Sequence, residues 1–307
     1  MVWGTLVAIY LFLAGIAGGA YLTATCIETF WANRGLEVIR RYGIMLSAPL
    51  VAISSVFLVL DAEAGLHNPV RLFYVMANFP HSMMSVGTLI ITGFQAVTLF
   101  AGWKAWKNEP QPGWLRVIGS LFAISLTVYT GLLLGVSKAI PFWNSSLLPL
   151  LFTVSGISTG CAAAVLLGIY VDKTQAEKLG NIKKVHVGLL VAEVVLIAML
   201  LSTAGKVELA GAQSAAKLIS GSLAPLFWIG LIGIGLGLPI VLEMYELLSK
   251  NKTSTSSLSA SAGGAAASAG SHSGVSMLVL TEVSVLTGGF ILRYLILAAA
   301  VYVTLLS

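Results

Sequence analysis

The sequence predicts an all-α polytopic membrane protein with eight transmembrane helices. Hydrophobic residues make up 57% of the chain and charged residues only 9%, whereas a soluble globular domain carries about 25% charged residues. The apolar residues gather in eight stretches, each long enough for the ~20 helical residues that cross ~30 Å of hydrocarbon. No part of the chain has the composition of a soluble catalytic domain.

The predicted spans follow one another along the chain. The first lacks a basic start and a small-residue cleavage site, so we interpret it as a retained span and not as a signal peptide. Asp61 ends the second span, His81 opens the third, and Trp143 leads into the fifth. A Ser/Ala/Gly-rich segment, 251–273, precedes the eighth and is predicted to be a flexible linker on the inner side. The spans cover residues 3–31, 42–62, 82–106, 114–137, 145–171, 184–204, 222–248 and 275–306.

The distribution of Lys and Arg predicts the orientation, because short cytoplasmic loops carry an excess of basic residues. One set of connections holds twelve Lys and Arg residues and the other holds four. The basic connections are therefore expected on the inner side of a prokaryotic cell (inner) membrane, and both termini on its outer side. The formal net charge of +5 follows from this topology, and we expect no nucleic-acid partner.

A weak internal repeat divides the chain in two. Gly15–Gly19 in the first span aligns with Gly156–Gly160 in the fifth, and both spans start from the predicted outer side. The repeat predicts two parallel four-helix halves, residues 1–140 and 141–307. The alternative is that small residues recur in any packed membrane helix, because they let backbones approach closely.

Neither haem nor an iron–sulfur cluster is expected in this chain. Cys26 and Cys161 stand alone, without the paired spacing that a cluster or a c-type haem needs. The four histidines provide no facing pair within the hydrocarbon, which a b-type haem would require. We therefore expect no metal site.

Polar side chains gather near the predicted outer ends of the spans. Polar groups in a membrane are costly and mark substrate, ion or proton routes. Phenol, imidazole, amide and carboxylate groups at this depth suit a ligand with an apolar tail and two proton-exchanging oxygens, which describes a quinone. The alternative is that Trp and Tyr populate both interfaces as anchors. The group comprises Tyr10, Asp61, His81, Tyr129, Trp143 and Asn144.

A second set of ionisable residues lies deeper and predicts a proton path through Glu193, Arg293 and Glu28. An unpaired charge at the bilayer centre costs ~3 kcal/mol even on the mildest scales. Arg293 is therefore expected to face the bundle interior and to form an ion pair, with Asp61 first and Glu193 second. Three glutamates lie near the predicted inner ends and could instead reach the headgroups: Glu28, Glu243 and Glu282.

Several motifs together resemble the NrfD/PsrC family, the membrane subunits of polysulfide-reductase-type complexes. The longest is PFWNSSLLPLLF at 141–152, followed by SGISTG at 155–160. The order of the motifs and their places at the helix ends make the match specific, although each motif alone is weak. The others are AGIAGG at 14–19, NPVRLF at 68–73, SMMSVG at 82–87, YTG at 129–131 and GGFILRY at 288–294.

The resemblance implies that the protein exchanges electrons with a quinone, menaquinone or a similar one, in anaerobic respiration. Its implied partners are a four-cubane ferredoxin-like iron–sulfur subunit and a molybdopterin catalytic subunit. The terminal substrate would react on the partner and not on this protein.

The resemblance also implies roles for particular residues. In the polysulfide reductase, a Tyr at the position of Tyr129 and a His in the first span contact the quinone. Here the residue in the first span is Tyr10, which leaves a hydrogen-bond donor but removes a group that titrates near neutral pH, and His81 is a candidate substitute. We expect Tyr129, Asp61 and His81 to take part in the reaction. The expected quinone contacts are Tyr10, Gly15, Gly19, Tyr129, Trp143 and Asn144.

A second function stays open. The protein could be a proton- or solute-conducting transporter module in which Glu193 and Arg293 line the pathway and no redox ligand binds. Flux of protons or solute through proteoliposomes that lack any redox partner would distinguish this module from a quinone-reactive subunit.

Overall fold

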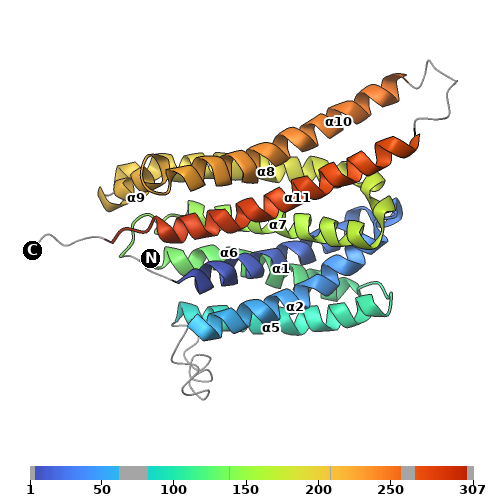
Figure 1. Cartoon of the computed structure of the whole chain (residues 1–307). Helices are drawn as coiled ribbons and strands as arrows, with labels where there is room; N and C mark the ends of the chain where they lie inside the picture. The colour runs from blue at the N-terminus through green and yellow to red at the C-terminus, as the bar shows by residue number, and fades with distance from the viewer. Residues whose placement is uncertain (1–3, 62–81, 138, 208, 257–266, 303–307) are drawn as a thin grey trace, which may run out of the picture.

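The computed structural model describes residues 4–61, 82–137, 139–207, 209–256 and 267–302. These residues form a bundle of long helices with no strand among them (Figure 1). Eight helical segments are long and apolar enough to cross a membrane, which confirms the predicted fold class. The elements are α1 (Thr5–Phe30), η1 (Ala32–Arg34), α2 (Glu37–Asp61), α5 (Met83–Trp106), α6 (Gly113–Gly135), α7 (Leu147–Val171), η2 (Lys173–Lys178), α8 (Gly180–Val207), α9 (Leu209–Ile219), η3 (Leu226–Gly237), α10 (Leu238–Ser256) and α11 (Ala267–Ala298).

The helices are stacked in layers, with α2 and α5 on one side, α8, α9 and α10 on the other, and α1, α6, α7 and α11 between them (Figure 1). Helix α1 begins and α11 ends at the same end of the bundle, which we call the terminus end; the other is the far end. Helices α1 and α7 are central, because each packs against α2, α6, α11 and the other.

Small residues allow the two central helices to touch. A Cβ atom on Gly19 would overlap the carbonyl oxygen of Gly156, and one on Gly160 would overlap the backbone of Gly19. The two aligned glycine motifs therefore meet each other at the α1–α7 contact. Close backbone approach is the usual basis of helix packing in membranes, where lipid removes the hydrophobic drive for association.

Large apolar side chains cover the outside of the bundle. Leu89 on α5, Leu121 on α6 and Val195 on α8 are 50%, 61% and 45% exposed. Such a surface would be unfavourable in water over the length of several helices. The arrangement is that of a multi-pass membrane protein, whose lipid-facing side chains need no polar character.

Several predicted boundaries differ from the structure by a few residues. Helix α2 starts at Glu37, not at 42, because its first turn is stabilised by an acidic residue and by the Glu37–Arg40 ion pair. Helices α10 and α11 extend into the segment predicted as a flexible linker, covering 251–256 and 267–273. Both extensions continue helices that are already formed inside the bundle, and adding a turn to an existing helix costs less than starting a new one.

The structure also contains elements that were not predicted, among them α9 and the π-helix η3. Amphipathic helix α9 occupies the connection after α8, and Lys217 in its last turn donates to the carbonyl oxygen of Ala298 at 2.9 Å, at the C-terminus of α11. The seventh span begins as a π-helix, η3, where Gly235 lies against Gly288 of α11. Such wide turns often occur at functional sites.

Candidate functional site

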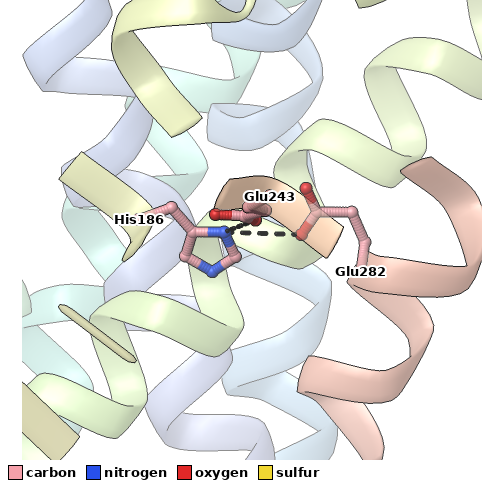
Figure 2. A group of neighbouring side chains, drawn as sticks. All are labelled: His186, Glu243 and Glu282. Atoms are coloured by element: carbon pink, nitrogen blue, oxygen red, sulfur yellow. Dashed lines mark hydrogen bonds and ion pairs between the residues drawn. The ribbon is translucent and has the colours of Figure 1, made fainter. Parts of the chain in front are cut away.

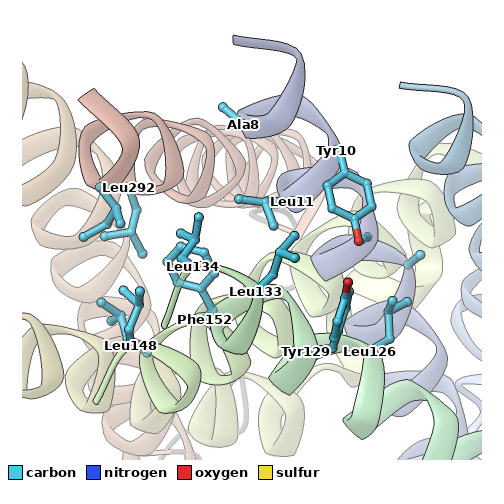
Figure 3. Close-up of a cluster of buried hydrophobic side chains, with 14 of the residues drawn as sticks. Ala8, Tyr10, Leu11, Leu126, Tyr129, Leu133, Leu134, Leu148, Phe152 and Leu292 are labelled. Carbon is cyan, nitrogen blue, oxygen red and sulfur yellow. The ribbon is translucent and has the colours of Figure 1, made fainter. Parts of the chain in front are cut away.

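Two tyrosines face each other at the terminus end of the bundle. Tyr10 on α1 is fully buried and Tyr129 on α6 is 3% exposed. Their hydroxyl groups point toward one another between α1 and α6 (Figure 3). Gly87 on α5 makes room for this arrangement, because a Cβ atom there would overlap the Tyr129 hydroxyl.

The hydroxyl groups of this region have unused hydrogen-bonding capacity. Neither the Tyr10 Oη nor the Ser85 Oγ on α5 has a hydrogen-bond partner among the described residues, although both atoms are buried. A buried polar group without a partner costs about 1–3 kcal/mol. The tyrosine pair is flanked by apolar side chains, including Leu11, Leu126 and Leu133 (Figure 3). Unpartnered donors in apolar surroundings fit a ligand that has an apolar body and carbonyl oxygens, as a quinone does.

The other predicted quinone contacts lie in different environments. Trp143 is fully buried and its indole N–H donates to the carbonyl oxygen of Ile296 at 2.8 Å, which holds the α6–α7 connection against α11. Asn144, next to it, is exposed. Gly15 and Gly19 lie at the contact between α1 and α7. The structure thus brings together Tyr10 and Tyr129 and uses the two glycines for helix packing.

Two of the three residues that are predicted to take part in the reaction cannot be placed. The side chain of Asp61, the last residue of α2, and the whole of His81 lie outside the described residues. Their roles stay predictions.

Arg293 on α11 is fully buried and faces the bundle interior, as predicted. Its guanidinium donates to the carbonyl oxygens of Leu11 at 3.2 Å and Gly289 at 2.7 Å, and to the Ser155 hydroxyl at 3.2 Å. It also lies 5.7 Å from the ring centre of Phe12. Arg293 therefore connects α11 to α1 and α7.

The predicted partner Glu193 does not form a direct ion pair with Arg293 among the described side chains. Its buried carboxyl group on α8 lies near the Ser155 hydroxyl, to which Arg293 donates. A hydroxyl group can accept from a guanidinium and donate to a carboxylate at the same time. Ser155 thus lies between the two predicted proton-path residues and could join them.

Glu28 lies at the far end, beside a pocket of about 440 Å³. Its carboxylate accepts from the backbone N–H of Gln111 at 2.8 Å and lies 3.6 Å from the Arg40 guanidinium. The Gln111 side chain accepts from the Tyr21 hydroxyl at 2.8 Å. The pocket is therefore connected to the bundle interior through Glu28, Gln111 and Tyr21.

One polar group was not predicted from the sequence. His186 on α8, Glu243 on α10 and Glu282 on α11 meet toward the far end, and each is at most 2% exposed (Figure 2). The alternative that Glu243 and Glu282 extend to the headgroups is wrong, because both are buried inside the bundle. A signal was present on α8, where Lys183, His186 and Glu193 recur at helical spacing and share its buried face.

The sequence is similar to curated membrane subunits of reductase complexes. It is 29% identical to the C chain of the polysulfide reductase of Wolinella succinogenes over 272 residues, which are 80% of this protein and 83% of the relative. It is 25% identical to the protein NrfD of Escherichia coli, with 79% and 84% covered. It is 24% identical to the C subunit of the selenate reductase of Mesobacillus selenatarsenatis, with 78% and 66% covered.

The family model described as polysulphide reductase, NrfD, matches residues 1–268. This match covers seven of the eight spans and all the buried groups described above except Glu282 and Arg293 of α11. The motifs that suggested the resemblance therefore led to the correct family: the chain belongs to the NrfD family of membrane subunits.

Proposed function

We propose that this protein is the membrane anchor that exchanges electrons between a quinone pool and a docked iron–sulfur subunit of a molybdopterin oxidoreductase. The observation that carries the proposal is the buried pair of Tyr10 and Tyr129, whose hydroxyl groups face each other in apolar surroundings. Support for a complex comes from the relatives, two of which are named as one component of a polysulfide reductase and of a selenate reductase.

The tyrosine pair would hold the head of the quinone. A bound quinone supplies two-electron, two-proton chemistry. Tyr129 and Tyr10 would each present a phenolic oxygen that donates a hydrogen bond and can pass a proton, while Ser85 supplies a third hydroxyl on α5. The neighbouring leucines would exclude water from the site, which strengthens each hydrogen bond in it.

The twelve-to-four distribution of basic residues predicts that the terminus end faces the outer side. The tyrosine pair would therefore lie on the outer side, where the iron–sulfur subunit would dock. Protons would reach the interior from the far end. The pocket beside Glu28 admits water, and the contacts through Gln111 to Tyr21 provide the first hydrogen bonds inward.

Quinol-linked turnover of the assembled complex tests the proposal. Tyr129→Phe and Tyr10→Phe should each lower turnover with quinol a few-fold to about tenfold, because a hydrogen bond between neutral groups is worth ~0.5–1.5 kcal/mol. Activity with an artificial dye that reacts directly with the partner subunits should not change. Tyr245→Phe is the matched control, because that tyrosine is 65% exposed on α10.

The proposal is contradicted if both tyrosine variants keep the quinol kinetics of the unmodified complex. Proton or solute flux through proteoliposomes of the protein without any redox partner would instead favour the conducting module.

A further inference from the structure

The group of His186, Glu243 and Glu282 combines three ligand atoms from three different helices. The Nδ1 atom of His186 lies 2.7 Å from the Glu243 Oε1 and 3.8 Å from the Glu282 Oε2. All three ligand atoms lie within 4.8 Å of one another (Figure 2). Neither Tyr10 nor Tyr129 belongs to this group, so a role for it does not depend on the proposed function.

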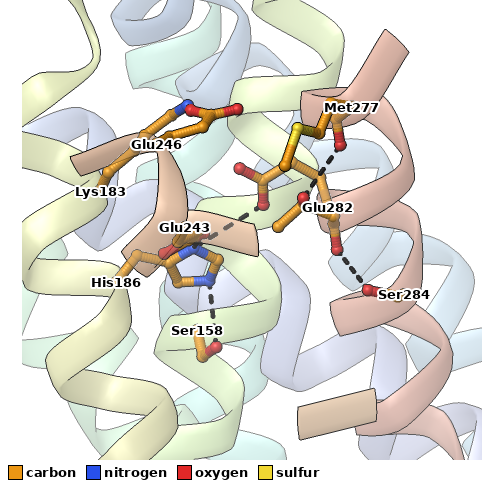
Figure 4. A network of polar contacts seen from close by, with 9 residues as sticks. Ser158, Lys183, His186, Glu243, Glu246, Met277, Glu282 and Ser284 are labelled. Atoms are coloured by element: carbon orange, nitrogen blue, oxygen red, sulfur yellow. Dashed lines mark hydrogen bonds and ion pairs between the residues drawn. The ribbon is translucent and has the colours of Figure 1, made fainter. Parts of the chain in front are cut away.

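The group can carry more negative than positive charge. Two buried carboxyl groups share one imidazole, and the nearby Lys183, whose charge also acts on Glu282, is ion-paired with Glu246 (Figure 4). Buried ionised carboxylates are very costly unless they are paired. The Glu282 Oε2, the oxygen nearest to the imidazole, and the Glu243 Oε2 accept no hydrogen bond from the described residues. A divalent cation would neutralise both carboxylates and engage their free oxygens.

The donor set indicates the class of cation. One imidazole nitrogen with carboxylate oxygens suits zinc, iron or manganese, whereas calcium and magnesium prefer oxygen ligands alone. Ligands at ~2.0–2.2 Å from a tetrahedral metal are about 3.3–3.6 Å apart. The separations of His186 Nδ1 from the two carboxylate oxygens, 2.7 and 3.8 Å, lie on either side of this range.

The surroundings of His186 match those of a metal ligand. Its second ring nitrogen, Nε2, lies 3.2 Å from the Ser158 hydroxyl on α7 (Figure 4). Metal-bound histidines commonly donate their other ring N–H to an acceptor, which fixes the ring and leaves the first nitrogen free for the metal. With Nε2 donating to Ser158, the lone pair of Nδ1 would face two carboxylates, an arrangement that needs a cation between them.

We propose that His186, Glu243 and Glu282 bind one divalent transition-metal ion of the zinc and manganese class. The ion would connect α8, α10 and α11 inside the bundle. The Lys183–Glu246 pair lies one turn closer to the far end on the same two helices, α8 and α10, and would close the path by which the ion enters.

Manganese binding to the purified full-length protein tests the proposal. The protein is prepared in detergent with a tag that contains no histidine, stripped with a chelator and titrated with Mn²⁺, whose free form is followed by electron paramagnetic resonance. We expect one Mn²⁺ per protein molecule, displaced by Zn²⁺. The bound ion should also show electron spin echo modulation from a directly coordinated ¹⁴N nucleus, that of His186.

Variants assign the ion to this group. Glu243→Gln and Glu282→Gln should each weaken Mn²⁺ binding at least about tenfold, because loss of even outer partners of a metal site costs that much. Glu37→Gln is the control: it removes an exposed glutamate from α2, which carries none of the three ligands, and should leave Mn²⁺ affinity unchanged.

Three results would overturn the proposal. The first is folded protein that binds no Mn²⁺ or Zn²⁺ at about 1 mM, which would leave a shared proton as the cation. The second is bound Mn²⁺ without nitrogen modulation, a measurement on the unmodified protein that does not depend on the variants folding. The third is binding that both glutamine variants retain in full.

Discussion

Replacing Arg293 should weaken the bundle as a whole, because this side chain joins α11 to α1 and α7. In Arg293→Ala, the Leu11 carbonyl oxygen and the Ser155 hydroxyl lose a charged donor inside the protein. A hydrogen bond to a charged group contributes about 1.5–3 kcal/mol, so the loss of the two costs about 3–6 kcal/mol. Removal of the buried side chain also leaves a cavity beside Phe12 and Phe152.

A loss of this size should lower the midpoint of thermal unfolding in detergent by on the order of 10 °C. Arg293→Lys should recover only part of it, because an ammonium group keeps the charge but cannot reach three acceptors in the geometry of a guanidinium. Lys184→Ala is the control, since it removes a positive charge from an exposed position on α8, where substitutions usually change stability by less than about 0.5 kcal/mol.

A double variant tests whether Ser155 couples Arg293 to Glu193. If Ser155 couples Arg293 to Glu193, the double variant Arg293→Ala, Glu193→Gln should be less destabilised than the sum of the single variants, because the second change removes the stranded carboxylate. Strict additivity would refute the link. An unfolding midpoint of Arg293→Ala equal to that of Lys184→Ala would refute the reasoning on the buried guanidinium itself.

Three other outcomes are expected. Gly19→Val should prevent α1 from packing on α7, because a Cβ atom at this position overlaps the backbone of Gly156. The yield of monodisperse protein measures this packing, and a normal yield would contradict the prediction. Asp172 lies outside the spans, and hydrogen bonds from Gln175 and Thr174 lower the pKa of its carboxyl group. The ionised carboxylate therefore stabilises the folded protein above the unfolded pKa of about 4. This stabilisation is lost as the pH falls through the lower pKa of the folded state. Asp172→Asn should therefore reduce stability at pH 7 and converge with the unmodified protein in acid, and a constant difference at all pH values would argue against this cause. The purified protein without partner subunits should show no Soret absorption, since its histidines and cysteines lack the spacing for haem; a Soret band that persists in such a preparation would show this expectation to be wrong.

The sequence was sufficient for the fold class, for the number of spans and for the family. Hydrocarbon accepts only segments whose backbone groups are satisfied internally, so an apolar stretch of sufficient length has to be a helix. The same rule does not apply at the ends of the spans. There the first turn of α2 depends on the local Glu37–Arg40 pair, and α9 is held by the contact of Lys217 with Ala298. The length of an apolar stretch reveals neither.

For the candidate site, the sequence identified types of residue and their depth. It selected Tyr10 and Tyr129 because both lie a few turns inside the predicted outer ends of their spans, at a depth that suits a quinone, and because the resemblance places quinone contacts on these two helices. It also identified Arg293 as buried, because no exposed guanidinium is tolerated at that depth. These inferences rest on the cost of placing one side chain in hydrocarbon, which is a property of that residue alone.

The partners of each residue were decided only by the tertiary structure. Arg293 and Leu11 are 282 residues apart, and His186 and Glu243 are 57 apart, so no spacing motif joins them. Contact between such residues depends on how each helix is rotated about its axis, which is set by close backbone approaches such as that of Gly19 to Gly156. Hydrophobicity identifies the helices, whereas small residues and packing determine which polar side chains meet inside them.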